Sequence, residues 1–123
     1  MTDTEDPGVG DLAELAARMR AFTEERDWGR FHDPKSLVLA LVGEVGELAE
    51  LLQWIPADEA VEHFRDPGRR ARVGEEMADV LLYLVRLADV LRVDLAAAAQ
   101  SKLIEADGRF PAADVRGMAP RRG

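Results

Sequence analysis

Residues 39–54 read LALVGEVGELAELLQW, and residues 74–91 read GEEMADVLLYLVRLADVL. In both segments apolar residues recur every three or four positions, which is the spacing of one face of an α-helix. The second segment is apolar around most of the helix, and such a helix is buried on most sides. A small four-helix chain can hardly bury it alone. We therefore predict an all-α protein of the four-helix-bundle type that forms a homo-oligomer. The alternative is a monomer with a few exposed leucines.

Capping signals bound the other predicted helices. An aspartate followed by a proline, as at Asp33-Pro34 and Asp66-Pro67, supplies an N-cap and a favoured first-turn residue. Asp94 is a third N-cap, and Gly108 is a stop signal. Together with the apolar periodicity, these signals predict helices over 11–26, 34–54, 67–92 and 95–107, and a short helix over 57–65.

Composition limits the class of protein. The chain of 123 residues fits one domain, predicted over 11–111 between flexible ends at 1–10 and 112–123. It has no cysteine, which excludes disulfides and thiolate metal sites. The sequence has no apolar run long enough to span a bilayer and no signal-peptide pattern, so we expect a cytoplasmic protein without a membrane partner. A net charge of −8 argues against binding to a nucleic acid polymer.

Each of the two apolar segments carries a pair of acidic residues three positions apart, Glu44 with Glu47 and Glu76 with Asp79. On a helix this spacing puts both carboxylates on one side. All four border the apolar stripe without a Lys or Arg four residues further on, and an ionised carboxylate there needs a neutralising partner. Four oxygen ligands from two helices suit Mg²⁺, with Mn²⁺ as the alternative ion, and Mg²⁺ usually accompanies a phosphate-bearing ligand. The alternative is that the acids decorate solvated helix faces.

Glycines and tryptophans surround the acidic pairs. Gly43 and Gly46 each cost about 1 kcal/mol within a helix relative to alanine, so they indicate close approach of a ligand or partner. Trp28, in the loop before the first acidic helix, and Trp54, at its end, are candidates for stacking on a nucleobase. Ordinary packing is the alternative for either tryptophan.

Other polar residues have two interpretations each. His32 is a candidate ligand contact or a partner for a loop carbonyl. Lys102 and Arg109 are candidates for phosphate oxygens, or cations that stabilise the end of their helix. Glu50, three residues beyond Glu47, is a candidate for positioning water or an exposed, paired residue.

These segments resemble the all-α MazG-like nucleoside triphosphate pyrophosphohydrolases. The resemblance rests on EVGELAE at 44–50, E-x-x-D at 76–79 and K-x₆-R-F-P at 102–111. The surrounding sequence is similar to the dCTP pyrophosphatase branch of that family in particular, through ERDW at 25–28, FHDP at 31–34, ALVGEVGELAELLQW at 40–54 and DVLLYLVRLADVLRVDL at 79–95. The similarity covers about residues 12–111.

The resemblance implies Mg²⁺-dependent cleavage of a (deoxy)nucleoside triphosphate, such as dCTP or a modified dCTP, to the monophosphate and pyrophosphate, in a homotetramer or dimer. It also implies roles for individual residues. Glu44, Glu47, Glu76 and Asp79 would be the metal ligands, Trp28 and Trp54 would contact the base, Tyr83 would lie near the substrate, and Lys102 would match the lysine of a K-x-x-x-N element. The catalytic base would be Glu47, with Glu50 as the alternative.

Two positions depart from the family pattern. Ala106 stands where the asparagine of the K-x-x-x-N element would be, and Met19 stands where the branch carries a histidine. Neither change removes a metal ligand, so both bear on base selectivity more than on the chemistry. Two further hypotheses stay open: a related enzyme, such as a dUTP or phosphoribosyl-ATP hydrolase, and a non-catalytic helical bundle that binds a nucleotide or a partner helix.

Overall fold

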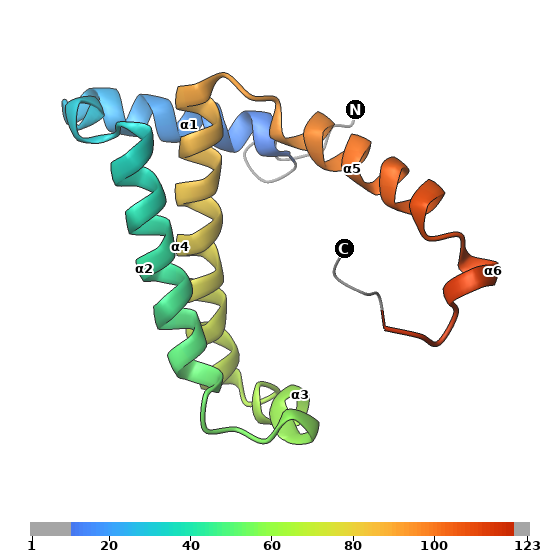
Figure 1. The fold of residues 1–123 in the computed structure, drawn as a ribbon. Helices are drawn as coiled ribbons and strands as arrows, with labels where there is room; N and C mark the ends of the chain where they lie inside the picture. The colour runs from blue at the N-terminus through green and yellow to red at the C-terminus, as the bar shows by residue number, and fades with distance from the viewer. Residues whose placement is uncertain (1–10, 120–123) are drawn as a thin grey trace, which may run out of the picture.

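The computed structural model describes residues 11–119, and every regular element in this range is a helix (Figure 1). The predicted all-α class is therefore confirmed for this part of the chain. The elements are α1 (Leu12–Glu25), the 3₁₀ turn η1 (Gly29–Phe31), α2 (Pro34–Leu52), the 3₁₀ turn η2 (Ala57–Glu59), α3 (Ala60–His63), α4 (Pro67–Leu91), α5 (Leu95–Arg109) and α6 (Ala112–Val115). None of the helices described is long and apolar enough to cross a membrane.

The predicted capping residues start their helices. Each accepts a hydrogen bond from a backbone N–H three residues further on: Asp33 from Ser36, Asp66 from Arg69 and Asp94 from Ala97, all at 3.0 Å. The chain also starts α1 with an N-cap that the prediction omits, Asp11. The structure forms one short helix, α6, within the predicted C-terminal tail. Pro111 precedes it as the N-cap residue, and the four residues that follow make one helical turn. The predicted tail residues 1–10 and 120–123 lie outside the described residues.

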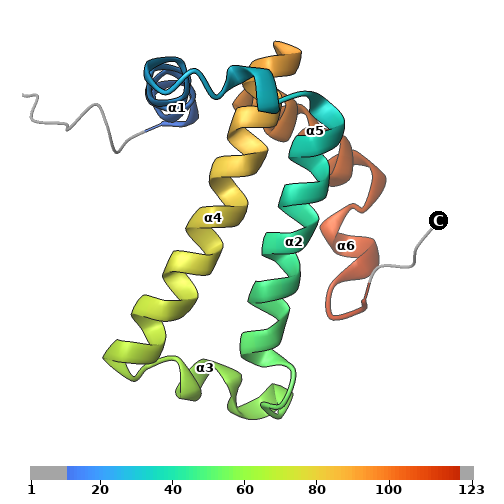
Figure 2. The same ribbon diagram turned by 90° about the vertical axis from the view of Figure 1, so that its left-hand side faces the viewer.

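Helices α2 and α4 run antiparallel and side by side, as the views in Figures 1 and 2 both show. Among the described elements they make the most extensive contact. Helix α1 crosses α4 near the C-terminal end of α4. Helix α5 leads away from this group and makes few contacts with it. Within one chain, α1, α2 and α4 therefore pack together, and α5 does not complete the predicted four-helix bundle.

The core of the single chain is small. Among residues 11–119, the apolar side chains that are buried are Leu37, Val85 and Ala88. Many large apolar residues of the long helices are exposed: Val38, Leu39, Val42, Val45 and Leu52 on α2, Met77, Leu81 and Leu91 on α4, and Leu103 and Ile104 on α5. An exposed apolar surface of this kind marks an interaction site, which agrees with the predicted oligomer. The oligomer itself stays a prediction.

Candidate active site

Three of the four predicted metal ligands meet where α2 packs against α4. Glu44 and Glu47 from α2 and Glu76 from α4 each offer a carboxylate oxygen, and these oxygens lie within 4.8 Å of one another. Glu76 is buried, Glu44 is half-buried and Glu47 is exposed. The i, i+3 spacing on α2 and the close contact of the two helices together create this acidic cluster, by which we mean Glu44, Glu47 and Glu76.

The fourth predicted ligand, Asp79, lies outside the 4.8 Å group. It is exposed on α4, one turn beyond Glu76, and its charge still contributes to raising the pKa of Glu44. Asp79 is therefore close enough to act on the acidic cluster electrostatically. Glu50, the alternative catalytic base, is exposed on α2 one turn beyond Glu47 and is also outside the group.

The acidic cluster perturbs its own titration. The pKa of Glu44 is raised from 4.5 to about 7, first by a hydrogen bond with the Glu47 carboxyl, then by burial and by the negative charges of Glu47, Asp79 and Glu76. Two carboxyl groups can hydrogen-bond only if one of them keeps its proton. The cluster therefore holds a proton near neutral pH unless a cation takes its place.

Two buried oxygens test whether these residues suit a metal. Glu44 Oε2 and Glu76 Oε2 are buried and have no hydrogen-bond partner among the residues that the structure describes. Leaving a buried carboxylate oxygen unpaired is costly, and such groups are rare in folded proteins. A divalent cation held by Glu44, Glu47 and Glu76 would supply a partner for buried carboxylate oxygens, and an all-oxygen ligand set is what Mg²⁺ prefers. The residues present therefore fit the predicted metal.

Arg72 is a residue of this site that the sequence analysis missed. Its Nη1 donates to Glu76 Oε1, and the two side chains form an ion pair four residues apart on α4. The sequence has no Lys or Arg four residues after any of the acids, but Arg72 lies four residues before Glu76, and a helix brings together pairs at this spacing in either order. Arg72 occupies one oxygen of Glu76 and leaves the other unpaired.

The two tryptophans lie at opposite ends of α2. Trp28 is 45% exposed and packs edge-on against Phe22, with ring centroids 5.8 Å apart, and Trp54 is 86% exposed. The 19 residues of α2 separate them, which is about 28 Å of helix. In one chain they therefore cannot contact the same base, and the predicted shared role requires a second chain.

The structure gives His32 a protein partner that differs from the predicted loop carbonyl. Its Nδ1 accepts a hydrogen bond of 3.0 Å from Nε of Arg86. The pKa of His32 is lowered by burial and then by the positive charge of Arg86. Tyr83, predicted to lie near the substrate, is half-buried on α4, one turn beyond Asp79.

The two predicted phosphate contacts are not close to the acidic cluster within this chain. Lys102 and Arg109 lie on α5 and face Glu105 at 3.5 Å and 3.6 Å. Their helix leaves the group after Arg92, which takes a left-handed conformation with φ of 59°. Helix α5 then leads away from α2 and α4, the two helices that carry the acidic cluster (Figure 1). Contact between these cations and a ligand held by the cluster would require a second chain.

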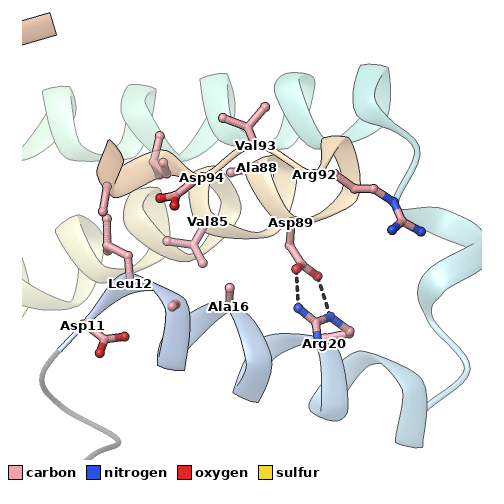
Figure 3. A pocket seen from close by; sticks show the side chains of 13 residues that line it. Asp11, Leu12, Ala16, Arg20, Val85, Ala88, Asp89, Arg92, Val93 and Asp94 are labelled. Carbon is pink, nitrogen blue, oxygen red and sulfur yellow. Dashed lines mark hydrogen bonds and ion pairs between the residues drawn. The ribbon is translucent and has the colours of Figure 1, made fainter. Parts of the chain in front are cut away.

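A hollow of about 460 Å³ lies elsewhere, between α1, the end of α4 and the start of α5 (Figure 3). Its lining includes Arg20, Val85, Ala88, Asp89 and Arg92. None of the predicted site residues lines it, so this hollow is distinct from the acidic cluster.

Two proteins to which this chain is similar are named dCTP pyrophosphatase 1. The chain is 46% identical over 114 residues to dCTP pyrophosphatase 1 of Bos taurus, covering 93% of this chain and 66% of that protein. It is 49% identical over 107 residues to dCTP pyrophosphatase 1 of Homo sapiens, covering 87% of this chain and 61% of that protein. The chain thus spans slightly less than two thirds of the length of these relatives.

A solved structure and a family model extend the comparison. The crystal structure of a pyrophosphatase from Archaeoglobus fulgidus matches with a TM-score of 0.75 and 32% identity, covering 90% of this chain and 98% of that one. The model of the MazG nucleotide pyrophosphohydrolase domain matches residues 32–112, a range that contains all four predicted metal ligands. The chain therefore belongs to the MazG nucleotide pyrophosphohydrolase domain family.

Proposed function

We propose that this protein is a Mg²⁺-dependent nucleoside triphosphate pyrophosphohydrolase that converts dCTP, or a modified dCTP, to the monophosphate and pyrophosphate. The observation that carries the proposal is the pair of buried, unpaired oxygens on Glu44 and Glu76 beside Glu47. The negative charges of the acidic cluster would repel a triphosphate by itself, whereas a divalent cation can bind both the carboxylates and the phosphates. The names of the Bos taurus and Homo sapiens relatives supply the choice of dCTP.

The acidic residues of the site would have different roles in the reaction. Glu44, Glu47, Glu76 and Asp79 would hold the cation, with Mn²⁺ as the alternative to Mg²⁺. When bound, the ion neutralises phosphate charge and orients the triphosphate. Glu47, the exposed member of the acidic cluster, would accept a proton from the water that attacks in line as the α–β anhydride bond breaks. Glu50 is the alternative base.

A complete site would be shared between copies of the chain, in a homodimer or homotetramer. Three observations support this: the exposed apolar residues of α2 and α4, the incomplete four-helix bundle within one chain, and the separation of Trp28 from Trp54 along α2. A second copy could bring its own tryptophan and the cations of α5, Lys102 and Arg109, toward the acidic cluster. His32 and Tyr83 would complete the substrate contacts.

Product analysis by ³¹P NMR tests the proposal. The protein is incubated with Mg²⁺ and, in turn, dCTP, a modified dCTP, dUTP and phosphoribosyl-ATP. The expected result is pyrophosphate and dCMP from dCTP, with no orthophosphate and no product from the E47A variant. Cleavage of dUTP or phosphoribosyl-ATP alone would reassign the substrate. Tight binding of a non-hydrolysable dCTP analogue without turnover would instead indicate a nucleotide-binding protein.

A further inference from the structure

Four polar residues from three parts of the chain form a continuous network, and the function proposed above gives a role only to its His32. Arg20 on α1 donates to both oxygens of Asp89 on α4, at 3.0 Å and 2.6 Å (Figure 3). Arg86, one turn before Asp89, donates to the same carboxylate through Nη1 at 3.1 Å and to His32 Nδ1 through Nε at 3.0 Å. We refer to Arg20, Asp89, Arg86 and His32 as the Arg86 network.

The centre of the Arg86 network is buried. Arg86 is 7% exposed and lies on α4 between the apolar residues Val85 and Leu87. A buried guanidinium is costly unless it is paired and hydrogen-bonded. Asp89 supplies the counter-charge, and its pKa is held below the usual range mainly by its hydrogen bond with Arg20. The network therefore fixes the position and direction of the Arg86 fork.

This direction determines the proton position on His32. Because Arg86 Nε–H donates to Nδ1, that nitrogen must carry a lone pair, so the proton of the neutral ring lies on Nε2. Burial and the charge of Arg86 lower the pKa of His32, which favours the neutral ring at pH 7. His32 then offers one N–H donor, on the side of the ring remote from Arg86.

The loop that carries His32 also carries Trp28. The backbone N–H of Trp28 donates to the carbonyl oxygen of Thr23 on α1 at 3.0 Å. The backbone N–H of His32 donates to the carbonyl oxygen of Gly29, within the same loop, at 3.0 Å. The contact between Arg86 and His32 joins the other end of this loop to α4. One buried residue thus sets the loop relative to the helix that provides Glu76.

We propose that Arg86 is a positioning residue: it holds His32 as a neutral Nε2–H donor and sets the Trp28–His32 loop for recognition of a hydrogen-bond acceptor on the nucleotide. The recognition part rests on the function proposed above, whereas the proton position on His32 does not. This role gives a function to a buried charge that lies among apolar neighbours on α4 and pairs with a residue 54 positions away in the chain.

NMR tests the proton position directly. The chain has two histidines, His32 and His63, so the H63Q variant assigns both sets of ring signals in long-range ¹H–¹⁵N spectra. We expect His32 to show the Nε2–H form in the wild type and a mixture of both forms in R86M, with a higher pKa. Arg70 on the same helix is exposed, and R70M is the matched control that should leave His32 unchanged. Unchanged His32 signals in folded R86M would overturn the proposal.

Kinetics and binding test the role in recognition. R86M and H32A should each raise KM for dCTP about tenfold, as expected for one lost hydrogen bond, with little change in kcat. The double variant should be no worse than either single variant, and R86K, which keeps a donor, should recover part of the loss. Fully additive effects would contradict the proposal.

The binding arm separates this inference from the proposed activity. Addition of Mg²⁺ and α,β-methylene-dCTP should shift the Nε2 signal of His32 in the wild type, whether or not the protein turns over dCTP. If the wild type does not turn over dCTP, the proposed enzymatic function is contradicted. The shift of the His32 signal on binding of the analogue still decides whether His32 contacts the nucleotide. No shift of His32 at saturating analogue would refute its role in recognition.

Discussion

Glu44 and Glu76 each bury one carboxylate oxygen near the contact of α2 with α4, and neither oxygen has a hydrogen-bond partner within residues 11–119. The two residues come from separate helices, so the packing of α2 against α4 must offset the unfavourable free energy of holding their carboxylates close together. Unpaired buried acids are commonly retained where they do chemical work. The acidic cluster is therefore the part of the fold whose titration and metal response are the most informative.

Mg²⁺ binding should depend steeply on pH. Because the pKa of Glu44 is raised to about 7, the metal must displace a proton at lower pH. Affinity for Mg²⁺ should therefore fall about tenfold per unit as pH drops below 7, measured by calorimetry, and proton release should be seen in buffers of different ionisation enthalpy. The isosteric E44Q variant should lose this dependence, and a wild-type affinity that is flat from pH 5 to 8 would count against the assignment.

The stability of the metal-free protein should show the opposite trend. The folded pKa of Glu44 lies above its ordinary value of 4.5, so the folded state binds more protons than the unfolded state between about 4.5 and 7. This contribution to stability is present below 4.5 and is lost as pH rises through about 7. Thermal unfolding should show Mg²⁺ raising Tm more at pH 8 than at pH 5.5. The same increment at both pH values would be inconsistent with this coupling.

Arg72 should compete with the cation for Glu76. Its guanidinium pairs with Glu76 Oε1 and adds a positive charge beside the acidic cluster. The R72Q variant should therefore bind Mg²⁺ several-fold more tightly in the absence of nucleotide, while its metal-free form melts at a lower temperature because Glu76 loses its partner. R70Q, on the same helix, is the matched control. Weaker Mg²⁺ binding by R72Q than by R70Q would show that Arg72 supports the metal.

Leu37 should dominate the stability of the contact between α2 and its neighbours. It is 1% exposed, and truncation of such a leucine to alanine costs about 2–5 kcal/mol of unfolding free energy. Val61 on α3 is 76% exposed, and V61A should change stability by no more than about 0.5 kcal/mol. Urea unfolding of both variants at one protein concentration gives the comparison. Equal losses would mean that the core lies elsewhere.

Mixing two inactive variants tests whether the site is shared between chains. E76Q loses a predicted metal ligand and W54A loses a predicted base contact. If one chain supplies the acidic cluster and its partner supplies Trp54, a mixed dimer contains one intact site. Random mixing should restore roughly a quarter of the wild-type rate, because half of the dimers are hybrids and each has one working site of two. No recovery after verified subunit exchange would place each site within one chain.

Local signals in the sequence were sufficient for much of the fold. Asp33 and Asp66 start their helices as predicted, because an N-cap depends on a few neighbouring residues. The acidic cluster could also be predicted in part, since helical periodicity puts Glu44 and Glu47 on one side of α2. Asp79 shares that periodicity but lies outside the closest group, since its exact distance depends on how the two helices pack.

Long-range features could not be predicted in the same way. The direction of α5 depends on the left-handed conformation of Arg92, which no sequence pattern specified because glycine is the usual residue there. The pairing of Arg86 with His32 joins residues far apart in the chain, and only the packing of α4 against the loop reveals it. The glycines of α2 suggest close approach of a ligand or partner, yet apart from their own helical turns no atom of the described chain would lie within 4 Å of a Cβ at Gly43 or Gly46.

The rate of pyrophosphate release from dCTP and Mg²⁺ by E76Q, compared with E75Q, tests the central claim most directly. The two glutamates are adjacent on α4, but Glu76 is buried in the acidic cluster and Glu75 is exposed outside it. We predict a loss of at least about 100-fold in E76Q, because even outer-shell partners of a metal can cost that much, and a near wild-type rate in E75Q. Wild-type activity in correctly folded E76Q would contradict the account.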